Sequence, residues 1–193
     1  MLGLKLPTDP RWVKLVETNI EEILTDHAWC EQKATSNAIS MIVGWPEHTE
    51  LVETLLEISQ EELQHFSQVH SIIKKRGFKL GKERKDSYVN ELFKFMRAGG
   101  SPEMRLLDRL LFSAMIEARS CERFKVLTDN IKDEELAQFY KELMISEAGH
   151  YTTYLKLAKK YAGKEDVDKR WKEFLEYEAE VIKNYGKRET VHG

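Results

Sequence analysis

The chain of 193 residues is 41% hydrophobic and 33% charged, with a formal net charge of -3, and this length and apolar content suit one domain with a well-buried core. Its two cysteines, Cys30 and Cys121, form no Cys-x-x-C motif, which argues against a disulfide framework or a rubredoxin-like iron site and favours a reducing, cytoplasmic location. No apolar run reaches the length of a membrane span and no basic segment precedes an apolar one at the N-terminus, so we expect a soluble protein with no membrane partner.

The first helix is expected from about residue 10 to residue 43, because Thr8, Asp9 and Pro10 supply an N-cap and a proline at the first helical position. Apolar residues follow this helix at intervals of three or four, and Glu31 lies in the middle of their stripe. A lone carboxylate is costly to bury, so Glu31 is a candidate metal ligand. Asp26 and His27, about one turn earlier, are either partners of that ligand, residues of the site entrance or ordinary surface residues.

The second helix is expected over about residues 47–76, between the helix-breaking Gly44-Trp45-Pro46 and Gly77. It carries a Glu-x-x-His motif made by Glu62 and His65. Residues three apart lie on one face of a helix, so the two side chains point the same way. Glu62 shares its stripe with apolar residues, whereas Glu61 aligns with polar ones, which makes Glu62 the ligand and Glu61 a solvated residue.

A linker of roughly two dozen residues follows, over about residues 78–100, with a short helical segment at about 87–97. It is too long for a tight helical hairpin, and a connection of this length lets a four-helix bundle cross over between its second and third helices.

The third helix is expected over about residues 102–130 and offers two acidic candidates. Glu117 lies in the apolar stripe and is the preferred ligand. Glu122 aligns with Arg119 and Asp129 and is kept as an outer-shell partner, or as a carboxylate that moves in on oxidation.

The fourth helix should begin after Asp133 and extend to about residue 161, and it carries a second Glu-x-x-His motif in Glu147 and His150. A last helix, over about residues 167–185, has Trp171, Leu175 and Ile182 on one face and is expected to pack outside the bundle. Residues 186–193 are expected to fray.

The two Glu-x-x-His motifs indicate a duplicated helix pair. Glu31 lies 31 residues before Glu62, and Glu117 lies 30 residues before Glu147. One Glu from each of two helices and a Glu-x-x-His from each of the other two form the ligand set of ferritin-like di-metal bundles. We therefore expect an all-α, ferritin-like four-helix bundle with a long crossover and an extra C-terminal helix. It would form one domain over residues 1–193, with the core bundle at about 10–163.

Four carboxylates and two imidazoles would nearly neutralise two divalent cations and favour iron or manganese over zinc. Such a pair can activate dioxygen for hydroxylation of a C–H bond. The expected metal ligands, which are also the expected catalytic residues, are Glu31, Glu62, His65, Glu117, Glu147 and His150.

Two longer strings are more specific than the Glu-x-x-His motifs: Asp-His-Ala-Trp-Cys-Glu-Gln-Lys-Ala at residues 26–34 and Glu-Ala-Arg-Ser-Cys-Glu-Arg-Phe at residues 117–124. With them, the chain resembles the di-iron tRNA hydroxylases that act on 2-methylthio-N6-isopentenyladenosine, over roughly residues 7–185. The resemblance implies a monooxygenase of tRNA modification that uses two iron ions, dioxygen as co-substrate and electrons from an external donor, a ferredoxin or reductase. The substrate would be the anticodon loop of tRNA, and all six ligand positions match.

Two alternatives share the fold. A small-molecule di-iron monooxygenase such as a demethoxyubiquinone hydroxylase would be expected to have a more exposed apolar face. A ferritin-like iron-storage or peroxide-scavenging protein would be expected to form a cage or to carry a Cys-rich iron domain. Because the chain is net acidic, tRNA binding requires a local basic patch, and the densest basic run lies within residues 74–85.

Overall fold

A computed structural model describes residues 2–184, and within that range the chain forms helices and no strand. The helices are α1 (Trp12–Thr18), α2 (Ile20–Gly44), α3 (Thr49–Lys75), α4 (Ser87–Phe93), α5 (Pro102–Asn130), α6 (Glu134–Tyr161) and α7 (Val167–Asn184). The described chain divides into two compact units. One consists of residues 18–85, and the other consists of residues 2–17 and 86–184.

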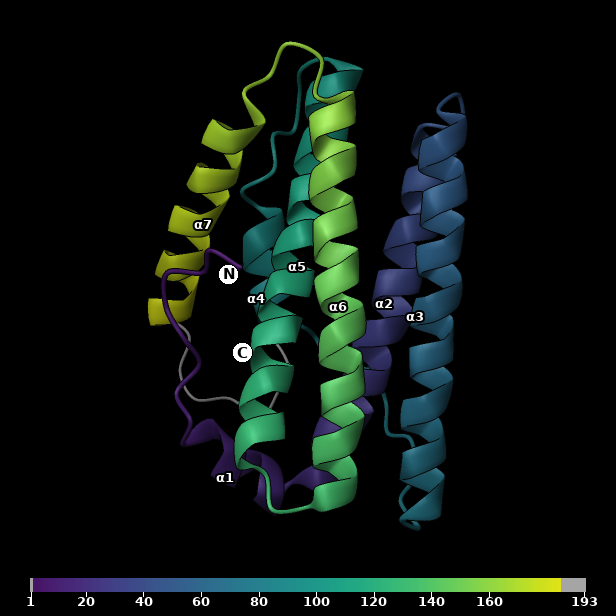
Figure 1. Ribbon diagram of the computed structural model, residues 1–193, viewed down its shortest axis with the longest axis vertical. Coiled ribbons are helices and arrows are strands. Elements are labelled where there is room, and N and C mark those ends of the chain that lie inside the picture. Colours follow the sequence, from purple (N-terminus) through teal and green to yellow (C-terminus); the bar gives the residue numbers. More distant parts are fainter. Residues whose placement is uncertain (1, 185–193) are drawn as a thin grey trace. The chain divides into compact units, whose positions relative to one another are not determined.

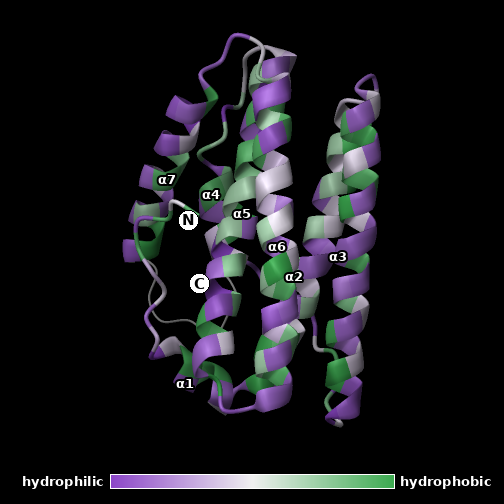
Figure 2. Cartoon of the chain, viewed as in Figure 1, coloured by the Kyte–Doolittle hydropathy of each residue, from purple (hydrophilic) through white to green (hydrophobic). Residues whose placement is uncertain are grey.

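The unit of residues 18–85 is a helical hairpin in which α2 and α3 pack side by side (Figure 1). Its apolar residues recur at helical spacing along both helices, as the hydropathy colouring shows (Figure 2). The buried apolar side chains of the hairpin include Ile23, Leu24, Ala28, Ala38, Met41, Leu51, Leu55, Ile58, Val69 and Ile73. The candidate ligands Glu31, Glu62 and His65 lie on these apolar stripes and are therefore buried with the core.

The end of α3 turns through Gly77, whose φ of 74° lies in the left-handed region that favours glycine. The Phe78 N–H donates to the Ile73 carbonyl and the Gly77 N–H to the Lys74 carbonyl, both at 3.0 Å, which is the Schellman arrangement. The chain then returns along α2. A Cβ at Gly81 would lie 3.1 Å from the Thr25 methyl group, so a glycine permits this close approach.

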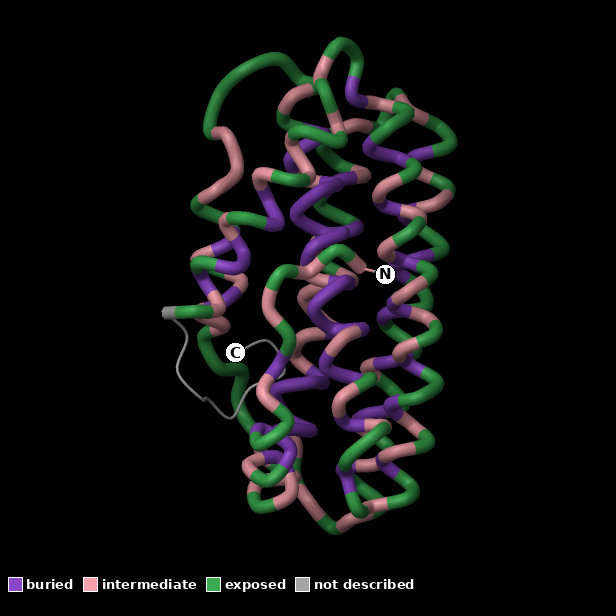
Figure 3. The backbone as a smooth tube through the Cα atoms, turned by 60° about the vertical axis from the view of Figure 1, so that its left-hand side comes forward, coloured by how far each residue is buried: buried purple, intermediate pink, exposed green. Residues whose placement is uncertain are grey.

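The second unit is built on the α5–α6 hairpin, with α4 and α7 packed against α5 and each other (Figure 1). Side-chain caps define the starts of these helices, because Ser101 accepts from the Met104 N–H and Asp133 from the Leu136 N–H. Buried residues concentrate along α5 (Figure 3). This helix is the central element of its unit.

A buried ionic network joins α5 to α7 and to the N-terminal segment. Arg119 and Glu178 are both fully buried, and the Arg119 guanidinium donates to Glu178 Oε1 at 2.6 and 2.8 Å. The Tyr88 hydroxyl donates to the same oxygen at 3.2 Å. Arg119 also donates to the Leu6 carbonyl at 3.0 Å. A buried charge needs such partners, so this network fixes α7 on α5.

Several expected boundaries were wrong. The single first helix of residues 10–43 is two helices separated at Asn19, whose backbone (φ -136°, ψ 42°) is not helical; asparagine favours helix ends over interiors. The segment at Asp9 forms a turn, and α1 begins only at Trp12. The expected segment of residues 87–97 ends as a helix at Phe93.

The last helix buries Phe174 and Glu178 more completely than Trp171.

The expected fraying of residues 186–193 lies outside the described residues. Among residues 2–184, no helix combines the length and the apolar content that a membrane crossing requires.

Candidate metal centre

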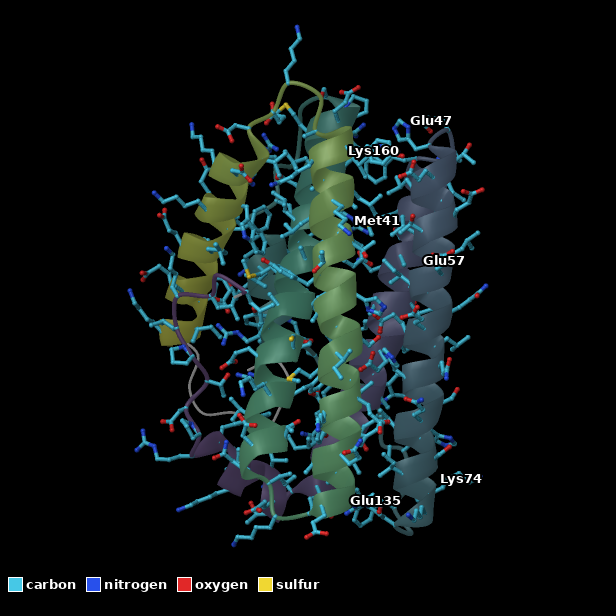
Figure 4. The ribbon with its side chains drawn as sticks, in the orientation of Figure 1. Met41, Glu47, Glu57, Lys74, Glu135 and Lys160 are labelled. Atoms are coloured by element: carbon cyan, nitrogen blue, oxygen red, sulfur yellow. The ribbon has the colours of Figure 1, made fainter. Side chains whose placement is uncertain are left out.

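The α2–α3 hairpin brings three of the six expected ligands together. Glu31, Glu62 and His65 each offer one ligand atom, and these atoms lie within 4.8 Å of one another. His65 Nδ1 is 3.7 Å from a Glu31 oxygen and 3.6 Å from a Glu62 oxygen. All three residues are buried, whereas Glu61 is exposed, as the register of α3 predicts. Glu57, on the same polar stripe as Glu61, is also exposed (Figure 4).

A further histidine holds Glu31 from within its own helix. His27 is fully buried one turn before Glu31, and its Nε2 lies 2.6 Å from Glu31 Oε1. Burial raises the pKa of Glu31, but hydrogen bonds from His27 and His65 outweigh this effect and lower the pKa to about 2. The carboxylate is therefore ionised and can only accept, so His27 Nε2 donates the proton in this bond.

The α5–α6 hairpin brings the other three expected ligands together. Glu117, Glu147 and His150 are buried, and one ligand atom from each lies within 4.8 Å of the others. His150 Nδ1 is 3.7 Å from a Glu147 oxygen, which matches the spacing of His65 and Glu62 in the other hairpin. Each unit thus carries the same half-site, made of one Glu and one Glu-x-x-His.

Glu122 is engaged away from this cluster. Its carboxylate accepts from the Thr8 N–H at 2.8 Å, from the Thr8 hydroxyl at 2.6 Å and from Arg119 at 2.9 Å. These bonds tie the N-terminal segment to α5. In this structure Glu122 therefore belongs to the ionic network, and Glu117 lies with Glu147 and His150.

The donors of each half-site fit a first-row divalent metal. Two carboxylates and one imidazole, grouped in a buried position, are the hard oxygen and nitrogen donors that iron and manganese accept. Buried carboxylates are costly without a compensating cation or hydrogen bonds. The buried Glu/His clusters are thus compatible with a di-iron site.

Two contributions were not assigned from the sequence. Arg119 stands in a string that is characteristic of the chain, yet its pairing with Glu178 joins residues 59 positions apart that no local pattern relates. The bonding of residues 79–85 to α2 was also not foreseen. Gly81, between Leu80 and Lys82, was the one available signal of close backbone approach.

Comparisons with known proteins agree with the geometry. The family model described as tRNA-(MS[2]IO[6]A)-hydroxylase (MiaE) matches residues 2–193. The tRNA 2-(methylsulfanyl)-N(6)-isopentenyladenosine(37) hydroxylase of Pseudomonas putida is 40% identical over 164 residues, covering 85% of this chain and 78% of that protein. The protein of the same name from Salmonella typhimurium is 29% identical, covering 93% of this chain and 83% of its own length.

A solved structure also resembles the whole chain. It is "Protein 43 with aldehyde deformylating oxygenase activity from Synechococcus", with a TM-score of 0.90 and 31% sequence identity, covering 98% of this chain and 95% of that one. This likeness, with helices alone in residues 2–184, confirms the expected all-α, ferritin-like fold class.

Proposed function

The chain belongs to the tRNA-(MS[2]IO[6]A)-hydroxylase family, and from this we propose that it hydroxylates the isopentenyl group of 2-methylthio-N6-isopentenyladenosine in tRNA. The observation that carries the proposal is the repeated half-site, because each hairpin groups one Glu with a Glu-x-x-His. Two equal donor sets of this kind suit a pair of like metal ions.

We propose that Glu31, Glu62, His65, Glu117, Glu147 and His150 together hold two iron ions, and that the whole chain forms one ferritin-like domain around them. When bound, the iron pair supplies the activation of dioxygen for insertion of one oxygen atom into an allylic C–H bond. The second oxygen atom leaves as water, which requires two electrons and two protons from outside the chain. A ferredoxin or reductase is the proposed electron donor.

The chain's own residues prepare the site for this chemistry. Metal ligands must be deprotonated to bind, and Glu31 is already ionised, since its pKa is about 2. His27 fixes one Glu31 oxygen, which leaves the other toward His65. Burial of all six ligands limits the access of water to the reacting groups.

A small-molecule oxygenase is the second candidate, because the similar Synechococcus protein is named for an aldehyde deformylating activity. The two candidates share the fold, so fold alone does not distinguish them. Their substrates differ completely in size and charge.

The test supplies iron-loaded protein, a chemical or enzymatic reductant and ¹⁸O₂ either with tRNA carrying 2-methylthio-N6-isopentenyladenosine or with a long-chain aldehyde. We expect the hydroxylated nucleoside with one ¹⁸O atom, detected by mass spectrometry, and no aldehyde turnover. The control is Glu62→Ala, which should abolish product, beside Glu61→Ala, which should not. Aldehyde turnover with unchanged tRNA would refute the proposal in favour of the second candidate.

A further inference from the structure

The segment of residues 79–85, here named the basic strap, is held against α2 by contacts made mainly through its backbone. The Gly81 carbonyl accepts from Trp29 Nε1 at 3.0 Å, and the Gly81 N–H donates to the Thr25 hydroxyl at 3.3 Å. The Lys79 N–H donates to Glu21 at 3.3 Å. Thr25 and Trp29 are four residues apart, so the strap crosses one face of α2.

Two ion pairs form at the end of the strap. Arg84 pairs with Glu22, and Glu83 pairs with Lys33 at 3.1 Å. Lys33 also donates to the Arg84 carbonyl at 3.2 Å. Glu21, Glu22 and Glu83 are thus bound to the strap backbone, to Arg84 and to Lys33 respectively.

Three lysine side chains of the strap are left for a partner. Lys79, Lys82 and Lys85 are exposed, and their ammonium groups form no ion pair within residues 2–184. They recur every third residue in a segment without helical structure, which spaces them by roughly 10 Å in an extended chain. Exposed Lys74, at the end of α3, adds a fourth cation to this part of the chain (Figure 4). Residues 74–85 hold seven basic residues and one acid, although the whole chain carries a net charge of -3.

Aromatic rings lie directly beside the strap. Trp29, which binds the strap through Gly81, has its ring centroid 6.1 Å from that of Phe66, and Phe66 stacks with His70 at 6.3 Å and 8°. All three side chains are half-buried, so part of each ring faces solvent. A row of lysines next to partly exposed rings is the combination that binds single-stranded nucleic acid, through phosphates and base stacking.

We propose that the basic strap and the Trp29–Phe66–His70 cluster form the surface that holds the anticodon loop of tRNA. Lys79, Lys82 and Lys85 contact backbone phosphates, and the aromatic cluster stacks an unpaired base. The proposal rests on the proposed function for the identity of the RNA, and it assigns the contact to the α2–α3 unit. Because the strap is held by backbone contacts, its lysine side chains can be changed without removing the bonds that position it.

The test measures binding of a fluorescent anticodon stem–loop, carrying the isopentenyl nucleoside, to the full-length iron-loaded chain at several salt concentrations. The variant is Lys79→Glu/Lys82→Glu/Lys85→Glu. Each lost phosphate contact should reduce the slope of log K against log salt by about 0.7, hence by about two for three contacts, with at least about tenfold weaker binding near 0.1 M salt. The matched control is Lys141→Glu/Lys156→Glu/Lys169→Glu, which makes the same charge change at exposed residues of the other unit.

We expect the strap variant alone to lose affinity, with its iron content unchanged. Equal losses in both triple variants would show that net charge rather than the strap governs binding, and no loss in the strap variant would also overturn the proposal. If the unchanged chain does not bind the RNA at all, both the proposed function and the proposed surface are wrong. If the unchanged chain binds and the strap variant binds equally well, only the proposed surface is wrong.

The stacking part of the surface has its own test. Phe66→Leu should weaken binding about fivefold or more with an unchanged salt slope. Phe66→Tyr, which keeps the ring, should bind the RNA as tightly as the unchanged chain does. Equal binding by the Leu and Tyr variants would remove the aromatic cluster from the surface.

Discussion

His27→Phe tests whether a residue that is not itself an expected ligand controls the half-site on α2 and α3. The change keeps a buried ring and removes the nitrogen that lies 2.6 Å from Glu31. Loss of such an outer hydrogen bond lowers metal affinity by about 10–100-fold. In the metal-free chain, a buried carboxylate that loses one partner costs about 1–3 kcal/mol. At about 2–4 °C per kcal/mol for a chain of this size, the melting temperature should fall by roughly 2–12 °C.

The assays are iron binding by competition with a coloured chelator and thermal unfolding of the metal-free chain by circular dichroism. His48→Phe is the control, because His48 is half-buried just before α3, its Nε2 lies 3.8 Å from Glu47 Oε1, and it stands 14 positions before Glu62 in the sequence. We expect weaker binding of one iron in His27→Phe and normal binding in the control. Unchanged iron affinity in His27→Phe would refute the role given to this bond.

Three further outcomes follow from named contacts. Glu117→Gln should lose iron, whereas Glu122→Gln should keep it and lose stability instead, as iron content and melting temperature will report; equal iron loss would contradict the separation of their roles. Glu178→Gln removes one of the two carboxylates that pair with the buried Arg119 and should lower the free energy of unfolding in urea by about 1–3 kcal/mol. The exposed Glu176→Gln on the same helix should lower it by about 0.5 kcal/mol or less. Burial raises the pKa of Asp108, but hydrogen bonds from Arg170 and Arg97 outweigh this effect and lower the pKa below its ordinary value. The stability that this group contributes is therefore present above about pH 4 and is lost as the pH falls. Asp108→Asn should flatten the decline of stability at acid pH, and an unaltered decline would count against this role of Asp108.

The helical register of the sequence predicted the placement of buried and exposed acids well. Glu62 and Glu61 are neighbours of identical chemistry, yet the apolar spacing of α3 separated the buried one from the exposed one. The start of α5 at Pro102 and its end at Asn130 were also predicted, because Ser101 and the preceding glycines are strong boundary signals. Periodicity and caps act locally, so one sequence is enough to read them.

Contacts between distant segments could not be read in this way. The helix break at Asn19 depends on one residue between two helical stretches that share an apolar pattern. The pairing of Arg119 with Glu178 and the bonding of the strap to Thr25 and Trp29 depend on tertiary packing. The assignment of the six metal ligands stays a prediction for the same reason. Each half-site lies within one hairpin, and it is a proposal that the two half-sites form one metal centre.

Mössbauer spectroscopy of the ⁵⁷Fe-loaded chain, combined with metal analysis, tests most directly whether the two half-sites form one di-iron centre. The proposed centre predicts close to two irons per chain with the magnetic coupling of a bridged pair, and loss of the coupled signal in either Glu62→Ala or Glu147→Ala. Two uncoupled irons, or full coupling after a half-site has been changed, would contradict it.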